Sequence, residues 1–164
     1  MHREGHYGAG LLVFAPLAFI LTAVGLDAVA MLGGAGVLIG AMLPDYDRRI
    51  PFVEHRGVTH SDAFAVAVGG VYALIGAVIG LQVGVLEAVG LAVFGFIIGT
   101  LTIAAHIAAD ALTPAGVEPF GEEWVSFEVT RAGNPVANWI LLGLGIVATG
   151  GAYLLGRTVA ELFV

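Results

Sequence analysis

Residues 83–110 read VGVLEAVGLAVFGFIIGTLTIAAHIAAD, a run in which Glu87 is the one charged residue before His106 and Asp110 near its end. A helix rises about 1.5 Å per residue, so about 20 apolar residues cross the hydrocarbon core of a bilayer, which is about 30 Å thick. The run exceeds this length. It therefore predicts a membrane-spanning helix over residues 83–109, whose surplus length is taken up by tilt or by the headgroup region.

Four further apolar stretches repeat this pattern along the chain. They cover residues 8–26, 28–43, 63–81 and 135–156. The second is short and follows Asp27 closely, so residues 8–43 are expected to form a tight helical hairpin. The sequence thus predicts an all-α fold, a polytopic membrane bundle of about five transmembrane helices in one domain over residues 1–164. Its motif-bearing loops are residues 44–62 and 110–134.

The composition excludes several classes of protein. Of 164 residues, 59% are hydrophobic and 12% are charged, whereas soluble domains average about 25% charged residues. The net charge is −7 and all six cations are arginine, so the chain lacks the basic stripe that nucleic-acid binding requires. Acid-rich, lysine-free loops suit a halophilic source. Without cysteine, any metal must be held by nitrogen and oxygen ligands.

The arginines predict how the chain is oriented in the membrane. Lys and Arg accumulate in cytoplasmic loops, whereas acids count for little. With the N-terminus inside, five of the six arginines are cytoplasmic, and Arg157 lies outside. The five are Arg3, Arg48, Arg49, Arg56 and Arg131.

Glycine is abundant, with 25 residues, and three pairs have four-residue spacing. The pairs are Gly36 with Gly40, Gly76 with Gly80, and Gly95 with Gly99. Small residues at this spacing let helix backbones approach closely in lipid. Such faces serve either packing within the bundle, the interpretation we favour, or a homo-oligomer.

The loop from Thr113 to Asn134 differs from the other loops because it is both acidic and aromatic. Its acids are Glu118, Glu122, Glu123 and Glu128, and its aromatic residues include Phe120, Trp124 and Phe127. Aromatic residues concentrate at membrane interfaces. We therefore expect this loop to lie over the cytoplasmic surface as a lid or brim.

Seven ionisable residues flank the ends of the predicted helices. They are His6, Asp45, Asp47, His55, His60, His106 and Asp110. In an up-and-down bundle the ends concerned alternate, so all seven belong to one face, the cytoplasmic one. This convergence is the strongest functional signal in the sequence.

Each of these residues also has a purely structural interpretation. His106 and Asp110 are four apart and stack on one helix side, where a simple hydrogen bond is the alternative to a shared metal. Ionisable groups at membrane depth are functional by default. Asp45 and Asp47 could be ordinary turn residues, and His6 could be solvated at the membrane boundary.

The loop residues carry similar alternatives. Ser61 or Asp62 next to His60 can cap the following helix, but capping does not explain the imidazole. Arg56 is suited to a bidentate grip on phosphate or carboxylate, although loop arginines are equally often solvated.

Histidines with carboxylates and no sulfur form the ligand set of hydrolytic zinc, manganese or iron centres. We expect one or two divalent ions, with zinc first. Such a metal lowers the pKa of water to about 7 and polarises a phosphoryl or acyl oxygen. Ser61 lacks a nucleophile elbow, and the sequence contains no phosphate loop or dinucleotide fingerprint. Water is therefore the expected nucleophile.

Four short motifs contain most of these polar residues: Leu43–Asp47 (LPDYD), His55–Ser61 (HRGVTHS), His106–Gly116 (HIAADALTPAG) and Pro119-Phe120. Together they resemble the YdjM-type family of membrane-bound, metal-dependent hydrolases. His6 is similar to the histidine of that family's N-terminal Thr-His element, with Gly5 in place of the threonine. The resemblance spans roughly residues 6 to 127. It implies an integral membrane protein with a metal site and a phospholipase-like activity.

The leading hypothesis is a hydrolase that acts on a lipid-borne phosphoester or ester. Its expected metal ligands are His6, Asp45, His60, His106 and Asp110. Beyond these, Asp47 supports a ligand or holds a second ion, His55 acts as general acid or base, and Arg56 clamps the headgroup. The alternative is a non-enzymatic metal-binding or metal-transport protein, but a transporter carries its ligands near the bilayer midplane. A purely structural bundle is the third hypothesis.

Overall fold

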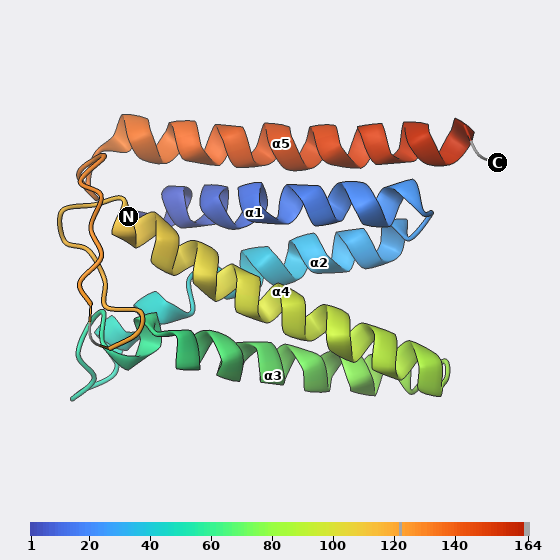
Figure 1. Cartoon of the computed structure of the whole chain (residues 1–164), viewed down its shortest axis with the longest axis horizontal. Helices are drawn as coiled ribbons and strands as arrows, with labels where there is room; N and C mark the ends of the chain where they lie inside the picture. Colours follow the sequence, from blue (N-terminus) through green and yellow to red (C-terminus); the bar gives the residue numbers. More distant parts are fainter. Residues whose placement is uncertain (122, 163–164) are drawn as a thin grey trace.

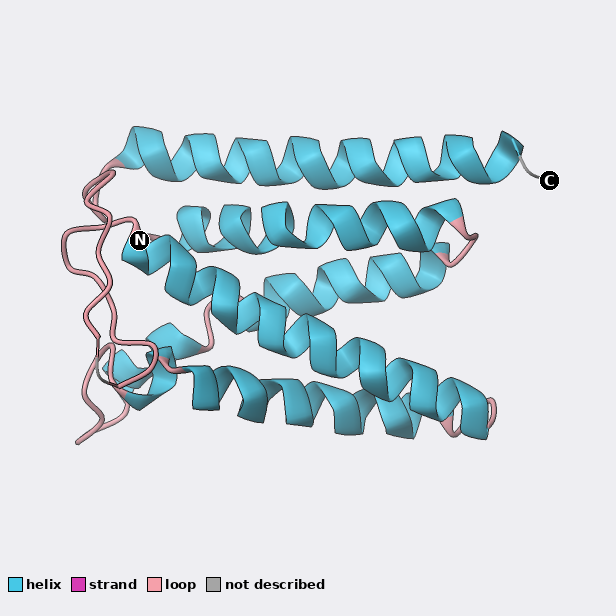
Figure 2. Ribbon diagram, viewed as in Figure 1, coloured by secondary structure: helices cyan, strands magenta, loops and turns pink. Residues whose placement is uncertain are grey.

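The computed structural model describes residues 1–121 and 123–162, and Glu122 of the acidic loop lies outside them. Five long helices and two short 3-10 helices make up the fold (Figures 1 and 2). The long helices are α1 (Arg3–Ala23), α2 (Asp27–Gly40), α3 (Asp62–Gly80), α4 (Val85–Ala111) and α5 (Pro135–Leu162). The short helices, η1 (Pro44–Arg49) and η2 (Val58–His60), lie between α2 and α3. Within the described residues, β-structure is limited to one isolated bridge between Val117 and Val125.

All five long helices are apolar and long enough to cross a membrane, the second when it is counted through η1 as Asp27–Arg49. This confirms the all-α, polytopic class. The helix ends differ from the predicted ones. α1 begins at Arg3 rather than at Gly8, so His6 lies inside the helix, and α4 continues to Ala111. The helix ends differ because hydropathy identifies only the apolar part of a helix, whereas the helical backbone hydrogen bonds continue through the polar residues at its ends.

The helices run up and down, which brings the polar connections together (Figure 1). The starts of α1, α3 and α5 and the ends of α2 and α4 lie at the same end of the bundle, together with η1 and η2. The most extensive helix contacts are those of α1 with α5 and of α3 with α4. The bundle therefore consists of two closely packed helix pairs, with α2 contacting both α1 and α4.

Glycines allow the close approach within each pair. A Cβ on Gly76 would clash with the Leu91 carbonyl of α4, and one on Gly95 would clash with the Tyr72 carbonyl of α3. In the other pair, a Cβ on Gly145 would clash with the backbone of α1. The glycine pairs on α3 and α4 thus pack within the bundle, in the manner that membrane helices use small residues.

The segment after α4 folds across the polar end of the bundle (Figure 2). The backbone N–H of Phe127 donates to the Ala111 carbonyl (2.8 Å), and that of Thr130 donates to the Leu112 carbonyl (3.1 Å). These bonds satisfy carbonyls that the end of a helix leaves unpaired. Phe120 and Trp124 remain largely exposed, so the segment offers aromatic side chains at the level where the helices end.

Candidate metal centre

Four ionisable side chains converge at the polar end of the bundle. They are Asp45 on η1, His60 on η2, and His106 and Asp110 on α4, and each offers one ligand atom within 4.8 Å of the others. Asp45 is 12% exposed, and the other three are buried. The structure thus brings together four of the five predicted ligands from three separate elements.

The two histidines of this cluster point their Nε2 atoms at each other. Nδ1 of His106 donates to the Ala41 carbonyl (2.7 Å), so its Nε2 carries a lone pair. The Thr59 hydroxyl donates to Oδ2 of Asp47 (2.7 Å), which leaves its oxygen to accept the Nδ1 proton of His60 (3.0 Å). The Nε2 atoms of His60 and His106 are 3.2 Å apart, and both are available to a cation.

The two carboxylates complete the cluster with oxygens that have no hydrogen-bond partner. Oδ1 of Asp45 lies 3.9 Å from Nε2 of both histidines. Oδ2 of Asp110 lies 3.4 Å from His60 and 3.8 Å from His106. Both oxygens are buried and unpartnered. Arg48 lies 3.8 Å from Oδ1 of Asp45, too far for a hydrogen bond. Burying an acceptor without a hydrogen-bond partner is costly, so a cation bound between these oxygens and the histidines would stabilise the site.

The spacing of the four atoms fits a divalent metal ion. A tetrahedral ion with bonds of about 2.0–2.1 Å holds its ligand atoms about 3.3–3.4 Å apart. The separations that involve a histidine run from 3.2 to 3.9 Å, and all four atoms lie within 4.8 Å of one another. Each histidine also donates its other ring proton to a protein oxygen, as metal-bound histidines usually do. The residues present therefore suit a metal held by nitrogen and oxygen.

His6 lies beside this cluster rather than among its four convergent atoms. Its ring stacks on His106, with ring centroids 3.7 Å apart. Nε2 of His6 lies 3.5 Å from Oδ1 of Asp110 and 3.1 Å from the Met1 carbonyl. Its Nδ1 is buried without a partner. The side chain is thus in direct contact with the centre.

Asp47 organises the loop that carries His60. The Asp47 carboxylate is buried and accepts hydrogen bonds from the Thr59 hydroxyl, from Nδ1 of His55 (2.9 Å) and from the backbone N–H of Arg56 (3.2 Å). Asp47, His55 and His60 also form a second group with ligand-like spacing. Asp47 therefore orients His60 through Thr59, on the side away from the four convergent atoms.

The side chains of His55 and Arg56 have different partners. His55 is partly exposed, and its Nε2 faces the Arg48 guanidinium at 2.7 Å. Arg56 has a φ of 67°, and its guanidinium donates to the Gly116 carbonyl (2.8 Å) and lies 3.3 Å from Oδ1 of Asp110. The predicted headgroup clamp is therefore occupied in holding Asp110.

The sequence pattern of the YdjM inner membrane protein family matches residues 1–163, essentially the whole chain. The chain belongs to this family. The match confirms the resemblance inferred from the motifs. The match and the five candidate spans together support a multi-pass membrane protein. No curated protein and no solved structure matches the chain. For this YdjM-family protein, the geometry of the site is therefore the main guide to function.

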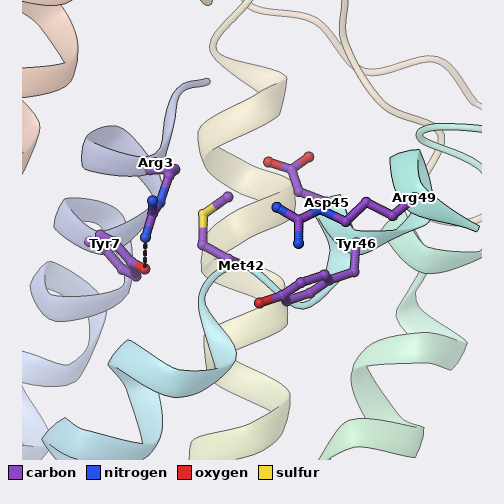
Figure 3. Close-up of a pocket in the computed structure, with 6 residues that line it drawn as sticks. All are labelled: Arg3, Tyr7, Met42, Asp45, Tyr46 and Arg49. Carbon is purple, nitrogen blue, oxygen red and sulfur yellow. Dashed lines mark hydrogen bonds between the residues drawn. The ribbon is translucent and has the colours of Figure 1, made fainter.

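A cavity of about 330 Å³ opens next to the candidate metal centre of this YdjM-family protein. Asp45 lines this cavity (Figure 3), and its Oδ1 lies 3.9 Å from Nε2 of both cluster histidines. The remaining lining residues are Arg3, Tyr7, Met42, Tyr46 and Arg49. The centre is thus adjacent to a space that a small ligand can enter.

Thr59 and, apart from Asp45, the residues that line this cavity were not predicted from the sequence as parts of a site. Thr59 directly precedes His60, but a threonine in a loop has many uses, and its bond to Asp47 depends on the fold. Arg3 and Tyr7 are spaced to share one helix face, yet the apolar run appeared to begin only after them. The four-residue spacing of Arg3 and Tyr7 therefore indicates a shared helix face only if the helix begins at Arg3, as it does in the structure.

Proposed function

We propose that this YdjM-family protein is a membrane-bound hydrolase that uses a divalent metal, zinc in the first instance, to cleave a lipid phosphoester. The observation that carries the proposal is the convergence of two histidine Nε2 atoms and two unpartnered carboxylate oxygens beside an open cavity. A divalent ion there would supply Lewis-acid chemistry, polarising a phosphoryl or acyl oxygen and making water a better nucleophile.

The residues of the chain hold and orient this centre. His106 is fixed by the Ala41 carbonyl, and His60 is fixed through Thr59 by Asp47. The Met1 ammonium and Arg56 both hold Oδ1 of Asp110, so that Oδ2 faces the histidines. Support of this kind keeps ligand geometry fixed and is typical of metal centres in proteins.

His55 is the candidate for proton transfer. Its Nδ1 proton is held by Asp47 (2.9 Å), which leaves Nε2 able to accept or release a proton at the partly exposed edge of the site. Arg48 now contacts that atom and also lies 3.8 Å from Asp45. A shift of the flexible arginine toward a substrate anion would free His55 for acid or base catalysis.

The proposed location is the cytoplasmic surface of the membrane. Five of the six arginines belong to helix starts, short helices and loops at the end of the bundle that carries the cluster, and Arg157 belongs to the last part of α5, whose C-terminal end lies at the other end of the bundle. Positive residues favour the cytoplasmic side. There the site faces lipid headgroups, and a lipid can reach it laterally without leaving the bilayer.

The position of the cluster favours an enzyme over a transporter. Transporter sites lie near the bilayer midplane, where helices are interrupted. Here Asp45 follows α2, His60 precedes α3, and Asp110 lies in the last turn of α4. The ligands therefore occupy helix ends at one surface.

The test is metal-dependent release of a headgroup. Purified protein, in detergent at high salt, would be loaded with zinc, manganese or iron and incubated with a panel of phospholipids and lipid phosphates. We expect release by the loaded wild type and by His2→Ala, an exposed histidine outside the cluster, and none by His106→Ala. If the loaded wild type retains metal but releases nothing from any lipid, the protein is a metal-binding protein.

A further inference from the structure

The cavity beside the metal centre has the composition of an anion site. It lies between the first turns of α1 and η1, and two arginines enter it from opposite sides, Arg3 from α1 and Arg49 from η1 (Figure 3). An adjoining hollow of about 410 Å³ shares both arginines and Asp45 and adds Arg48. Three arginines thus line these two spaces together with two carboxylates, those of Asp45 and Glu4.

Each of the two cavity arginines is positioned by a tyrosine from its own helix. The Arg3 guanidinium donates to the Tyr7 hydroxyl (3.3 Å) and lies 5.8 Å from the centroid of that ring. The Arg49 guanidinium lies 5.2 Å from the centroid of the Tyr46 ring. Aromatic faces attract guanidinium groups at these distances. The tyrosines therefore restrict two otherwise flexible cations to the walls of the cavity.

Arg3 and Arg49 also lack the carboxylate partner that each of three other arginines has. Arg48, Arg56 and Arg157 each lie within 4.0 Å of an aspartate. Across residues 1–121 and 123–162, no carboxylate oxygen lies that close to Arg3 or Arg49. Their charges are therefore available to a ligand.

We propose that Arg3 and Arg49 bind the phosphate group of a phosphoester, which places its reacting bond beside Asp45 and the metal centre. Guanidinium groups bind phosphate through paired hydrogen bonds, and the tyrosine hydroxyls offer further donors. The volume of about 330 Å³ is at the small end for ligand sites, which run from about 300 to 1,000 Å³. It suits a headgroup phosphate, while acyl chains remain in the bilayer.

This inference rests on the proposed hydrolase, and it names the part of the substrate that the site recognises. The phosphate could belong to a lipid or to a soluble phosphoester. The test is equilibrium binding to purified metal-loaded protein with two probes, inorganic phosphate and a short-chain phosphatidic acid. We compare wild type, Arg3→Gln, Arg49→Gln and Arg131→Gln, the last an exposed arginine that does not line the cavity.

We expect each cavity variant to bind phosphatidic acid about 10- to 100-fold more weakly, because each loses a charged hydrogen-bond donor. Arg131→Gln should bind like the wild type. Metal content and the unfolding midpoint, measured in parallel, should not change because both cavity arginines are exposed. Arginine-dependent binding of phosphatidic acid alone would assign the site to lipid, and equal binding of inorganic phosphate would assign it to the phosphate group itself.

The outcome separates this proposal from the hydrolase proposal. If wild type hydrolyses lipid while both cavity variants keep its affinity and KM, the arginine site is wrong and the hydrolase stands. If no lipid is hydrolysed but binding still depends on Arg3 and Arg49, the hydrolase is wrong and the arginine site stands.

Discussion

Nε2 of His60 lies 3.2 Å from Nε2 of His106, although the two residues are 46 positions apart and belong to η2 and α4. Both rings commit their Nδ1 protons to other oxygens. Two imidazole lone pairs at this distance repel each other unless a cation or a proton lies between them. The pair therefore offers two nitrogen ligands to a cation, and in the absence of a cation it shares one proton as a hydrogen bond.

The first test of this pair is His106→Ala. We expect this variant to lose its metal. Mutating a residue that only supports a ligand typically lowers metal affinity about 10- to 100-fold, and removing a ligand itself lowers the affinity further. Elemental analysis of the purified protein gives the metal content, with His2→Ala as the matched control. Full occupancy in His106→Ala would remove this histidine from the ligand set.

The link from Asp47 to His60 makes a separate prediction for Thr59. Thr59→Val removes the hydroxyl that donates to Asp47 and accepts from His60, and it should weaken metal binding about 10- to 100-fold. Thr59→Ser keeps the hydroxyl and should retain most of the affinity. Competition with a chelator measures both, and equal affinities for the two variants would show that the hydroxyl has no such role.

His55 and Arg56 are neighbours in sequence but should differ when mutated. His55→Ala removes no atom of the four-residue cluster, so we expect it to keep the metal and to lose lipid turnover. Arg56→Ala removes one of the two cationic groups that contact Oδ1 of Asp110, the other being the Met1 ammonium, and should lower metal affinity as well. Metal content and headgroup release are measured for each. Normal turnover in His55→Ala would rule out His55 as the acid or base.

Membrane orientation can be tested because the chain has no cysteine. Phe52 is fully exposed at the end with the metal centre, and Val83 is exposed in the turn between α3 and α4 at the other end. In intact cells, an impermeant thiol reagent should label Val83→Cys and leave Phe52→Cys unlabelled until the cells are lysed. The reverse pattern would place the metal centre outside the cell.

Two glycines of α5 provide a matched test of helix packing. A Cβ at position 145 would clash with the backbone of α1, whereas one at position 143 meets no atom within 4 Å. We expect Gly145→Ala to lower the free energy of unfolding by about 1–3 kcal/mol. Gly143→Ala should be neutral or stabilise the helix by about 0.5–1 kcal/mol. Unfolding in detergent compares the two, and equal stabilities would contradict the close contact between α1 and α5.

The sequence predicted the helices well because the bilayer imposes a minimum apolar length on each span. It also predicted which residues share one end of the bundle, because successive membrane-spanning helices run in opposite directions and this fixes the end at which each connection lies. The start of α1 was misjudged because Arg3, Glu4 and His6 interrupt the apolar run. The helix nevertheless continues through them, so that Arg3 and Tyr7 share one side of it.

Side-chain roles within the 44–62 loop could not be read from the sequence. His55 and Arg56 are adjacent, yet the left-handed backbone at Arg56 directs it to Asp110 while His55 turns to Asp47. Such a divergence depends on local backbone angles and on partners from α4 that are distant in sequence. Neither the backbone angles nor the α4 partners can be predicted from residue type and spacing.

The division of the bundle into two helix pairs gives the metal centre a mechanical consequence. Asp45 is attached to α2, which packs on the α1 side, whereas Asp110 belongs to the α3–α4 pair. An ion shared by these residues would cross-link the two halves of the protein. Its free-energy contribution rises with ion concentration, to about 4 kcal/mol at a thousandfold excess over Kd. Metal supply would then set how rigidly the two halves are joined.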